Sequence, residues 1–283
     1  DLPGGLLFAA ALALLTIGLA RTAQPGIAFL WFILAALAAT ALAVYRQATA
    51  ADPLLPRTLL RAWDFRHANL AHLLVGAALI IGMVTVPLMA DTVLYASPLE
   101  GGLRLLRMTI AISAGALVGG ILTQRLGARP PALAGLALTG AGFLLMSRWG
   151  LDIAEPWMTV HLAVTGLGFG LLIAPITESA LHSSRAEDRG AGSALLTVSR
   201  MMGMTIGLAA LTAWGSSRFQ LLAGGLTFSL DPAAQAAFEE GAVEAALTVF
   251  RGFFAAAAGV AFAILIPALL MTRRPGTRLP PQR

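Results

Sequence analysis

The sequence predicts an all-α polytopic membrane protein with eight transmembrane helices, on three observations. Of its 283 residues, 58% are hydrophobic and 12% are charged, whereas a soluble domain carries roughly 45–50% apolar and about 25% charged residues. Uncharged runs of about 20 residues, the helix length that crosses a hydrocarbon core of roughly 30 Å, recur along the whole chain. Arginines gather on alternate connections between these runs. This pattern excludes a water-soluble fold.

Eight runs qualify as transmembrane helices. In chain order they are roughly Gly4–Ala20, Gly26–Tyr45, Ala68–Ala90, Pro98–Gln124, Pro130–Ser147, Pro156–Leu181, Gly190–Trp214 and Gly252–Thr272. A residue that can cap or open a helix stands at the start of four of them: Asp1, Pro25, Pro130 and Pro156. The fourth run has the strongest start signal, because Ser97-Pro98-Leu99-Glu100 combines a capping serine, a proline at the first helical position and a glutamate three residues after the cap.

The arginines give the predicted orientation. If the first helix runs outward, the inner connections and tail hold Arg46, Arg57, Arg61, Arg66, Arg125, Arg129, Arg185, Arg189, Arg273, Arg274, Arg278 and Arg283, and the outer side holds Arg21, Arg148, Arg218 and Arg251. The positive-inside rule then places both ends of this segment in the cytoplasm, with the helices in the cell (inner) membrane. The net charge of +5 is thereby explained by topology and by contact with the lipid bilayer as partner, and no nucleic acid partner is expected.

Two connections are long. The inner one runs from Arg46 to Arg66 and contains Pro53 and Pro56. In the outer one, near residues 216–250, Asp231-Pro232 precedes apolar residues at helical spacing, so we expect a short amphipathic interfacial helix there.

Ionisable residues inside the runs are the candidate functional residues, because each costs about 2.5–3.5 kcal/mol to insert. Arg104 and Arg107 lie about 9 and 14 Å into the fourth helix, and Arg200 lies about 15 Å into the seventh, near the midplane. Arg104 can extend to the interface, and Arg107 can pair with Asp91 or Glu100.

Two acidic residues, one in the sixth helix and one at the end of the third, complete the candidate functional residues. Glu178 is near the inner end of its helix, where we expect a salt-bridge latch with Arg185 or Arg189 rather than a proton carrier. Asp91 closes the third helix. Arg200 cannot easily reach the membrane–water interface, so we expect it to handle substrate or to gate, with a structural hydrogen-bonding role as the alternative.

The sequence does not indicate metal or cofactor chemistry. Cysteine is absent and the four histidines are unclustered, so neither a metal site nor a cofactor is expected. Glycines recur at four-residue spacing at Gly115 and Gly119, Gly166 and Gly170, and Gly203 and Gly207, which predicts closely packed helices.

Two stretches resemble the major facilitator superfamily. GGILTQRLGARP, at 119–130, is similar to its short inner-loop signature and matches it at Gly120, Leu122, Arg125, Gly127 and Arg129, whereas Gln124 replaces an aspartate. Residues 166–209 resemble the fourteen-helix drug:proton antiporter branch. They match at Gly166, Gly168, Gly170, Pro175, Arg189, Gly190, Arg200, Gly203 and Gly207. Ser97–Leu106 also resembles this branch, although Arg107 stands where its members have proline.

The resemblance implies two central linker helices at 1–46, a cytoplasmic connection at 47–67 and the C-terminal six-helix half of a major facilitator fold at 68–283. The N-terminal six-helix half would be a missing partner. Since the chain begins at Asp1 and its first methionine is Met83, we expect it to be a piece of a longer protein.

The function implied is proton-coupled export of small amphipathic organic compounds of the multidrug type, by alternating access between two halves. A facilitator or importer of a small organic anion, bound by Arg107 and Arg200, is the first alternative. A membrane-embedded transferase is more remote, because no Asp-rich metal motif or nucleophile elbow is present. A structural or interaction role remains for a product that stands alone.

Overall fold

The computed structural model describes residues 2–20, 27–50, 60–181, 189–225 and 232–270. These residues are mostly helical, with no strand among them. The helices are α1 (Leu2–Ala20), α2 (Ile27–Thr49), α4 (Trp63–Thr92), α5 (Pro98–Leu126), α6 (Arg129–Met146), α7 (Glu155–Leu181), α8 (Arg189–Ala223), α9 (Pro232–Ala263) and α10 (Leu265–Leu270). The all-α membrane fold is confirmed. Arg185 and residues 51–59 of the inner connection lie outside the described residues.

Each of the eight predicted spans corresponds to a helix. Six segments are long and apolar enough to cross a membrane, namely α2, α4, α5, α7, α8, and α9 continued by α10. The helix α6, with 18 residues, and the apolar part of α1 are shorter. The division into two linker helices and a six-helix half stays a prediction.

The segment between Gly215 and Arg251 differs from the short interfacial helix that we expected. Instead, α8 continues to Ala223, and α9 begins at Pro232 and runs through Arg251 to Ala263. At 1.5 Å per residue, these helices of 35 and 32 residues are about 52 and 48 Å long, well beyond a roughly 30 Å core. Because no proline or glycine pair interrupts α9 before its last turns, the amphipathic stretch and the apolar run fold as one helix.

The end of α9 is set by a proline. Pro267 has no N–H to donate to the Ala263 carbonyl, so the helix is interrupted and α10 follows. The Ile264 N–H lies within hydrogen-bond distance of both the Val260 and the Ala261 carbonyls, at 3.2 Å each.

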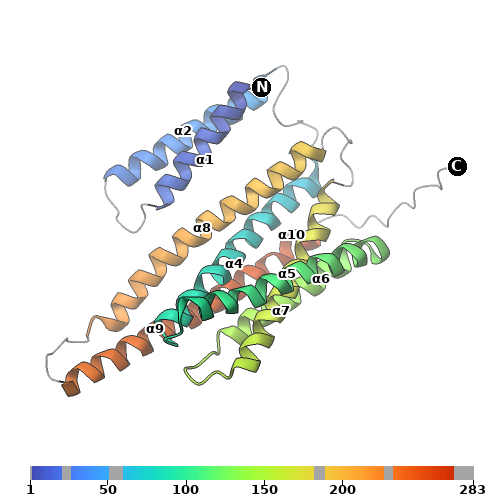
Figure 1. Cartoon of the computed structure of the whole chain (residues 1–283). Coiled ribbons are helices and arrows are strands. Elements are labelled where there is room, and N and C mark those ends of the chain that lie inside the picture. The colour runs from blue at the N-terminus through green and yellow to red at the C-terminus, as the bar shows by residue number, and fades with distance from the viewer. Residues whose placement is uncertain (1, 21–26, 51–59, 182–188, 226–231, 271–283) are drawn as a thin grey trace.

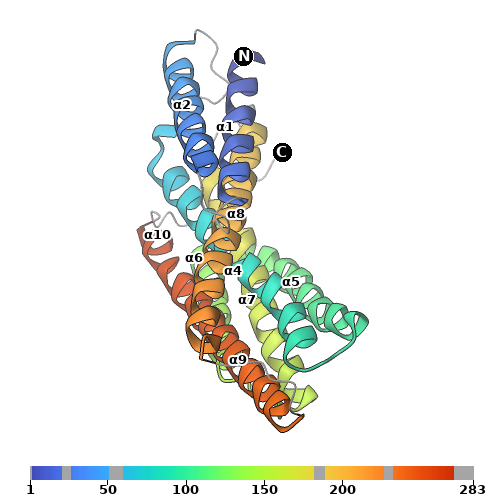
Figure 2. The same cartoon turned by 90° about the vertical axis from the view of Figure 1, so that its left-hand side faces the viewer.

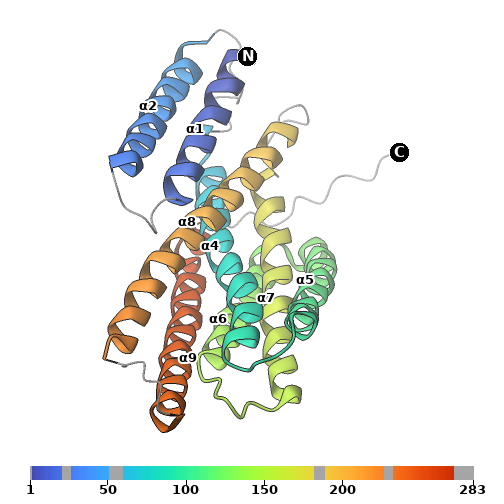
Figure 3. The ribbon, with the colours of Figure 1, turned by 60° about the vertical axis from the view of Figure 1, so that its left-hand side comes forward.

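The most extensive helix contacts of the bundle are those of α7 with α5 and with α6, and those of α4 with α8. Figure 3 shows α4 between α8 and α7, and in Figure 2 α5 lies on the side of the bundle away from α9. α6 packs against α7 and α9, and α9 also packs against α4. The α1–α2 hairpin lies beside α8, at the edge of the bundle (Figure 1). We call the end that carries the α4–α5 and α6–α7 turns the outer end, after the predicted orientation.

Glycines bring the paired helices into backbone contact, as their spacing predicted. A Cβ placed on Gly203 would lie 1.8 Å from the Leu73 carbonyl oxygen, and one on Gly76 would lie 1.9 Å from that of Arg200. In the other pair, a Cβ on Gly170 would lie 2.2 Å from the Ile112 carbonyl oxygen. No side chain larger than hydrogen fits at these positions unless the helices separate.

Aromatic rings fill the core between α6, α7 and α9. Phe143 packs edge-on against Phe169, with ring centroids 5.8 Å apart, and Trp149 packs against Phe254 at 5.5 Å. The Arg251 Nε donates to the Trp149 carbonyl oxygen at 2.7 Å. This bond ties the α6–α7 turn to α9 at the outer end.

Replacement of Gly76 by alanine is expected to destabilise the protein. The added methyl group would overlap the Arg200 carbonyl, so α4 and α8 must separate, and the free energy of unfolding should fall by roughly 1–3 kcal/mol. Thermal unfolding in detergent measures this change. The matched control is Gly259→Ala in α9, where a Cβ meets nothing within 4 Å. Equal losses in the two variants would contradict the importance of the α4–α8 contact.

Candidate functional site

An ionic cluster joins α5 to α7 at the outer end. Arg104 donates from Nε and Nη2 to the Glu155 Oε1, at 3.1 and 2.8 Å. Arg107 donates from Nη1 to the Glu155 Oε2 and to the Thr159 hydroxyl, the latter at 2.8 Å. Both arginines therefore converge on one carboxylate at the start of α7. We call Arg104, Arg107, Glu155 and Thr159 the outer ionic cluster.

The partner of Arg107 differs from the ones we expected. Glu100 instead completes the predicted capping box, accepting from the Ser97 N–H at 2.8 Å. Asp91 is exposed and makes no ion pair with another described residue. Glu155 takes both arginines because Arg104 and Arg107 lie one turn apart on α5, facing the first turn of the helix packed against it.

Arg104 is the more buried of the two arginines, although sequence position placed Arg107 deeper. The Arg104 side chain is 13% exposed and that of Arg107 is 36% exposed. The Arg104 Nη1 is buried and makes no hydrogen bond with another described residue. Arg104 lines a cavity of about 450 Å³ together with Tyr95, Glu155, Met158 and Val243. We call it the ionic cavity.

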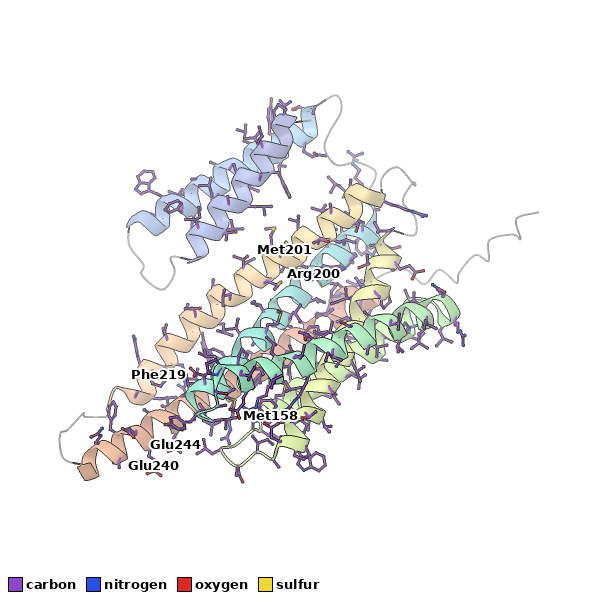
Figure 4. The ribbon with its side chains drawn as sticks, viewed as in Figure 1. Met158, Arg200, Met201, Phe219, Glu240 and Glu244 are labelled. Carbon is purple, nitrogen blue, oxygen red and sulfur yellow. The ribbon has the colours of Figure 1, made fainter. Side chains whose placement is uncertain are left out.

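A second cavity is almost wholly apolar. It lies between the outer parts of α4, α8 and α9 and has a volume of about 610 Å³. Leu88, Phe219, Phe250 and Phe253 are typical of its lining, and Glu239 alone is charged among its described lining residues. In Figure 4, Phe219 marks its position toward the far end of α8. We call this cavity the apolar pocket.

A polar network crosses α4, α7 and α8 nearer the inner end. The Ser199 hydroxyl lies 2.7 Å from the Asn69 Oδ1. The Thr177 hydroxyl donates to the Ile173 carbonyl at 2.9 Å, so its oxygen accepts from the His72 Nε2 at 3.1 Å. The His72 Nδ1 is then a buried acceptor, and it has no hydrogen-bond partner.

Arg200 adjoins this network about a third of the way along α8 from its start (Figure 4). It follows Ser199, and its backbone carbonyl packs on Gly76, one turn beyond His72 on α4. The side chain is half-buried, and the structure gives it no hydrogen bond or ion pair within the described residues. A guanidinium at this depth calls for a polar partner from elsewhere, or for a water-filled space.

The remaining predicted site residues lie at the inner end. Glu178 is exposed and, within the described residues, pairs with no arginine; Arg189 and Gly190 open α8 and are also exposed. Gly127 has φ +81° and ends α5, with its N–H donating to the Thr123 carbonyl.

The other inner-loop residues occupy the same connection. Gln124 and Arg125 are exposed in the last turn of α5, Gly120 faces open space one turn earlier, and Arg129 opens α6. Their expected gating role stays a prediction.

Sequence reasoning missed Glu155 as the central carboxylate and the polar network around His72. A signal for the first exists, since Glu155 and Thr159 stand one turn apart at the start of a helix. The sequence carries no such signal for the polar network, because the bonds of the network join residues 105 and 130 positions apart. Within the described residues, no group of three or more His, Asp or Glu side chains could hold a metal ion.

Comparison with known proteins supports membrane transport rather than enzymatic activity. No protein-family model matches the chain. A triacylglyceride transporter of Mycolicibacterium hassiacum is 38% identical over 235 residues, which are 77% of this chain and 44% of the relative. Proteins of the same name from Mycolicibacterium smegmatis and Mycobacterium tuberculosis are 37% and 34% identical, over 77% and 82% of this chain and 42% and 48% of their own lengths. The chain thus spans about half the length of these relatives.

Glu155→Gln is expected to loosen the outer ends of α5 and α7. The neutral amide accepts weakly from two guanidinium groups and leaves Arg104, which is mostly buried, without its counter-charge. Since Glu155 itself is 50% exposed, we expect a loss of about 1–2 kcal/mol in the free energy of unfolding. Hydrogen exchange of the first turns of α5 and α7 should rise with it. Glu240→Gln, on the exposed surface of α9, is the control, and equal exchange in both variants would show that the cluster does not hold the helices together.

Proposed function

We propose that this chain is the C-terminal part of a secondary active transporter that carries strongly apolar, lipid-type substrates across or out of the cell membrane. Two observations support the proposal. The relatives described above are named triacylglyceride transporters and match more than three quarters of the chain. The apolar pocket offers a compartment of matching chemistry on this chain itself.

The apolar pocket is the structural observation that carries this proposal. Its volume of about 610 Å³ falls in the range of small-molecule and cofactor sites, roughly 300–1,000 Å³. Phenylalanine rings and aliphatic side chains line it, and the polar groups are few. Such a lining favours an acyl chain over an anionic dye, because an anion would lose its hydration there beside a lining whose one charged side chain among the described residues is Glu239.

The proposed mechanism is alternating access of the major facilitator type, as the resemblance of the inner loops implies. In this scheme the chain supplies two linker helices and one six-helix half, and a second half completes the substrate path. Both ends of the segment lie in the cytoplasm, and protons are the proposed coupling ion.

Arg200 is the proposed coupling or substrate residue. It sits about 17 Å along α8 and has no partner within the described residues, while its neighbour Ser199 is bonded to α4. An uncompensated guanidinium near the midplane is costly. A carboxylate or a polar substrate group brought by the other half would lower that cost in one conformation and withdraw in another.

Export of amphipathic organic compounds is the second candidate, because the apolar pocket accepts their hydrophobic parts as well. An organic-anion carrier is less well supported. Arg107, one of the two arginines it requires, is bonded to Glu155 and Thr159.

Reconstitution of the intact protein tests the substrate. In proteoliposomes with an imposed proton gradient, we expect movement of a fluorescent triacylglyceride, and loss of that movement when a protonophore collapses the gradient. A cationic dye and an organic anion serve as competing substrates. Transport of the dye alone would replace the proposal with multidrug export, and movement of the anion alone would favour the carrier of anions.

Replacement of Arg200 tests its role. Arg200→Ala is expected to lower lipid transport by at least tenfold, which corresponds to about 1.4 kcal/mol, and Arg200→Lys should restore only part of the rate because lysine lacks the planar fork of donors. Arg218→Ala, an exposed arginine on the same helix, is the control. Unchanged transport by Arg200→Ala would remove this residue from the mechanism.

A further inference from the structure

We infer that the ionic cavity and the apolar pocket together form one binding site for a neutral ester-bearing lipid, with the ester end beside Arg104 and Tyr95 and an acyl chain in the apolar pocket. The inference rests on the proposed lipid transport and gives it a site on this chain. It assigns binding roles to Arg104, Tyr95 and Val243.

The two cavities are neighbours. Tyr95 and Val243 line both of them, so the boundary between the cavities is formed by one residue of the α4–α5 turn and one residue of α9. On one side of this boundary lie the paired charges of Arg104 and Glu155. On the other side lie the phenylalanines of α8 and α9. A ligand that fills both must have a polar end joined directly to a hydrocarbon end.

The charges indicate a neutral polar end. The ionic cavity is lined by one arginine and one glutamate, and these two are bonded to each other. An anionic headgroup would meet the Glu155 carboxylate, and a cationic one would meet Arg104. An ester carbonyl accepts hydrogen bonds without bringing a charge, so it can accept from Arg104 without disturbing the bonds of this arginine to Glu155.

Donors for such a carbonyl are present. Both carboxylate oxygens of Glu155 are engaged by the arginines, whereas the Arg104 Nη1 makes no hydrogen bond among the described residues. The Tyr95 side chain is 74% exposed, and its hydroxyl makes no hydrogen bond with another described residue. A buried guanidinium nitrogen without an acceptor carries a desolvation cost, which a ligand carbonyl would relieve after a small shift of the side chain.

The backbone of Tyr95 supports this assignment. Tyr95 has φ +49°, the left-handed conformation that residues other than glycine rarely adopt. It is held there from both sides, since the Ala96 N–H donates to the Ala90 carbonyl at 2.9 Å and the capping box of Ser97 and Glu100 begins directly afterwards. The strained turn fixes the aromatic ring at the boundary of the two cavities, and such strain is found preferentially at ligand sites.

The first experiment locates the lipid in the intact protein. A triacylglyceride with a photoreactive diazirine on one acyl chain is cross-linked to the purified protein, and the labelled peptides are identified by mass spectrometry. We expect labels on the parts of α8 and α9 that line the apolar pocket. Val243→Trp places an indole at the shared boundary and should reduce that labelling several-fold. The same change at Val44, an exposed position on α2, is the matched control.

The second experiment tests the ester contact. Binding of the triacylglyceride is compared with binding of a hydrocarbon probe of the same chain length that lacks the esters. Arg104→Gln should weaken binding of the ester by about tenfold and leave binding of the hydrocarbon unchanged. Arg107→Gln breaks the other bond to Glu155 but removes no lining residue of the ionic cavity, so the preference for the ester should persist. Tyr95→Phe should lower the preference by a smaller factor.

The outcomes separate this site from the proposed function. Lipid transport with no labelling of the apolar pocket, or with equal labelling of the Val243→Trp and Val44→Trp variants, would overturn the two-part site and leave the proposed function standing. If the labelling depends on Val243 and ester binding depends on Arg104, but the protein moves no lipid, the site stands and the transport role is overturned. If Arg104→Gln weakens the binding of both probes equally, Arg104 acts only as a bridge between helices.

Discussion

The backbone contacts between α4 and α8 and between α5 and α7 are the constraint on which the rest of the bundle depends. In a bilayer, burial of apolar side chains gives no driving force for helix association, since lipid tails are as apolar as leucine. Glycine compensates by allowing two backbones to approach until carbonyl oxygens meet the opposite helix, as at Gly203 against Leu73 and Gly170 against Ile112. Each of these interfaces is also crossed by a polar contact from one candidate site, and the bond between His72 and Thr177 joins α4 to α7 as well. Arg104 reaches Glu155 between α5 and α7, and Asn69 meets Ser199 between α4 and α8.

This arrangement makes two groups, α4 with α8 and α7 with α5 and α6, that touch each other less extensively than the helices within a group do. α9 connects them through its packing on α4 and α6, and Arg251 connects α9 to the α6–α7 turn. Tyr95 and the ionic cavity lie where these two groups meet at the outer end, and the apolar pocket adjoins them between α4, α8 and α9. A change in the angle between the groups would therefore alter the ionic cavity while the glycine contacts stay closed, which gives a physical route from helix movement to ligand affinity.

The fold could be predicted from the sequence more fully than the site. Eight apolar runs, the capping box at Ser97 and the spaced glycines each act through neighbours in the chain, and each is found in the structure. The junction of α8 and α9 was harder to predict. An amphipathic segment that extends a transmembrane helix has the same sequence pattern as a separate interfacial helix. The partners of Arg107 and His72 depend on helix pairing across some 50 to 105 residues, which periodicity does not encode. The left-handed backbone conformation of Tyr95 could not be predicted from the sequence, because tyrosine has no preference for it.

A lipid ligand poses a problem of selectivity that the ionic cavity can solve. An acyl chain that leaves the bilayer for the apolar pocket passes from one hydrocarbon medium to another, so the transfer contributes little free energy and selects for nothing beyond shape. The polar end is different. In the membrane core an ester carbonyl finds few donors, whereas beside Arg104 and Tyr95 it would meet a guanidinium and a hydroxyl that can donate to it. These donors at the boundary of the apolar pocket would therefore distinguish an ester lipid from the surrounding chains, while the pocket only accommodates it.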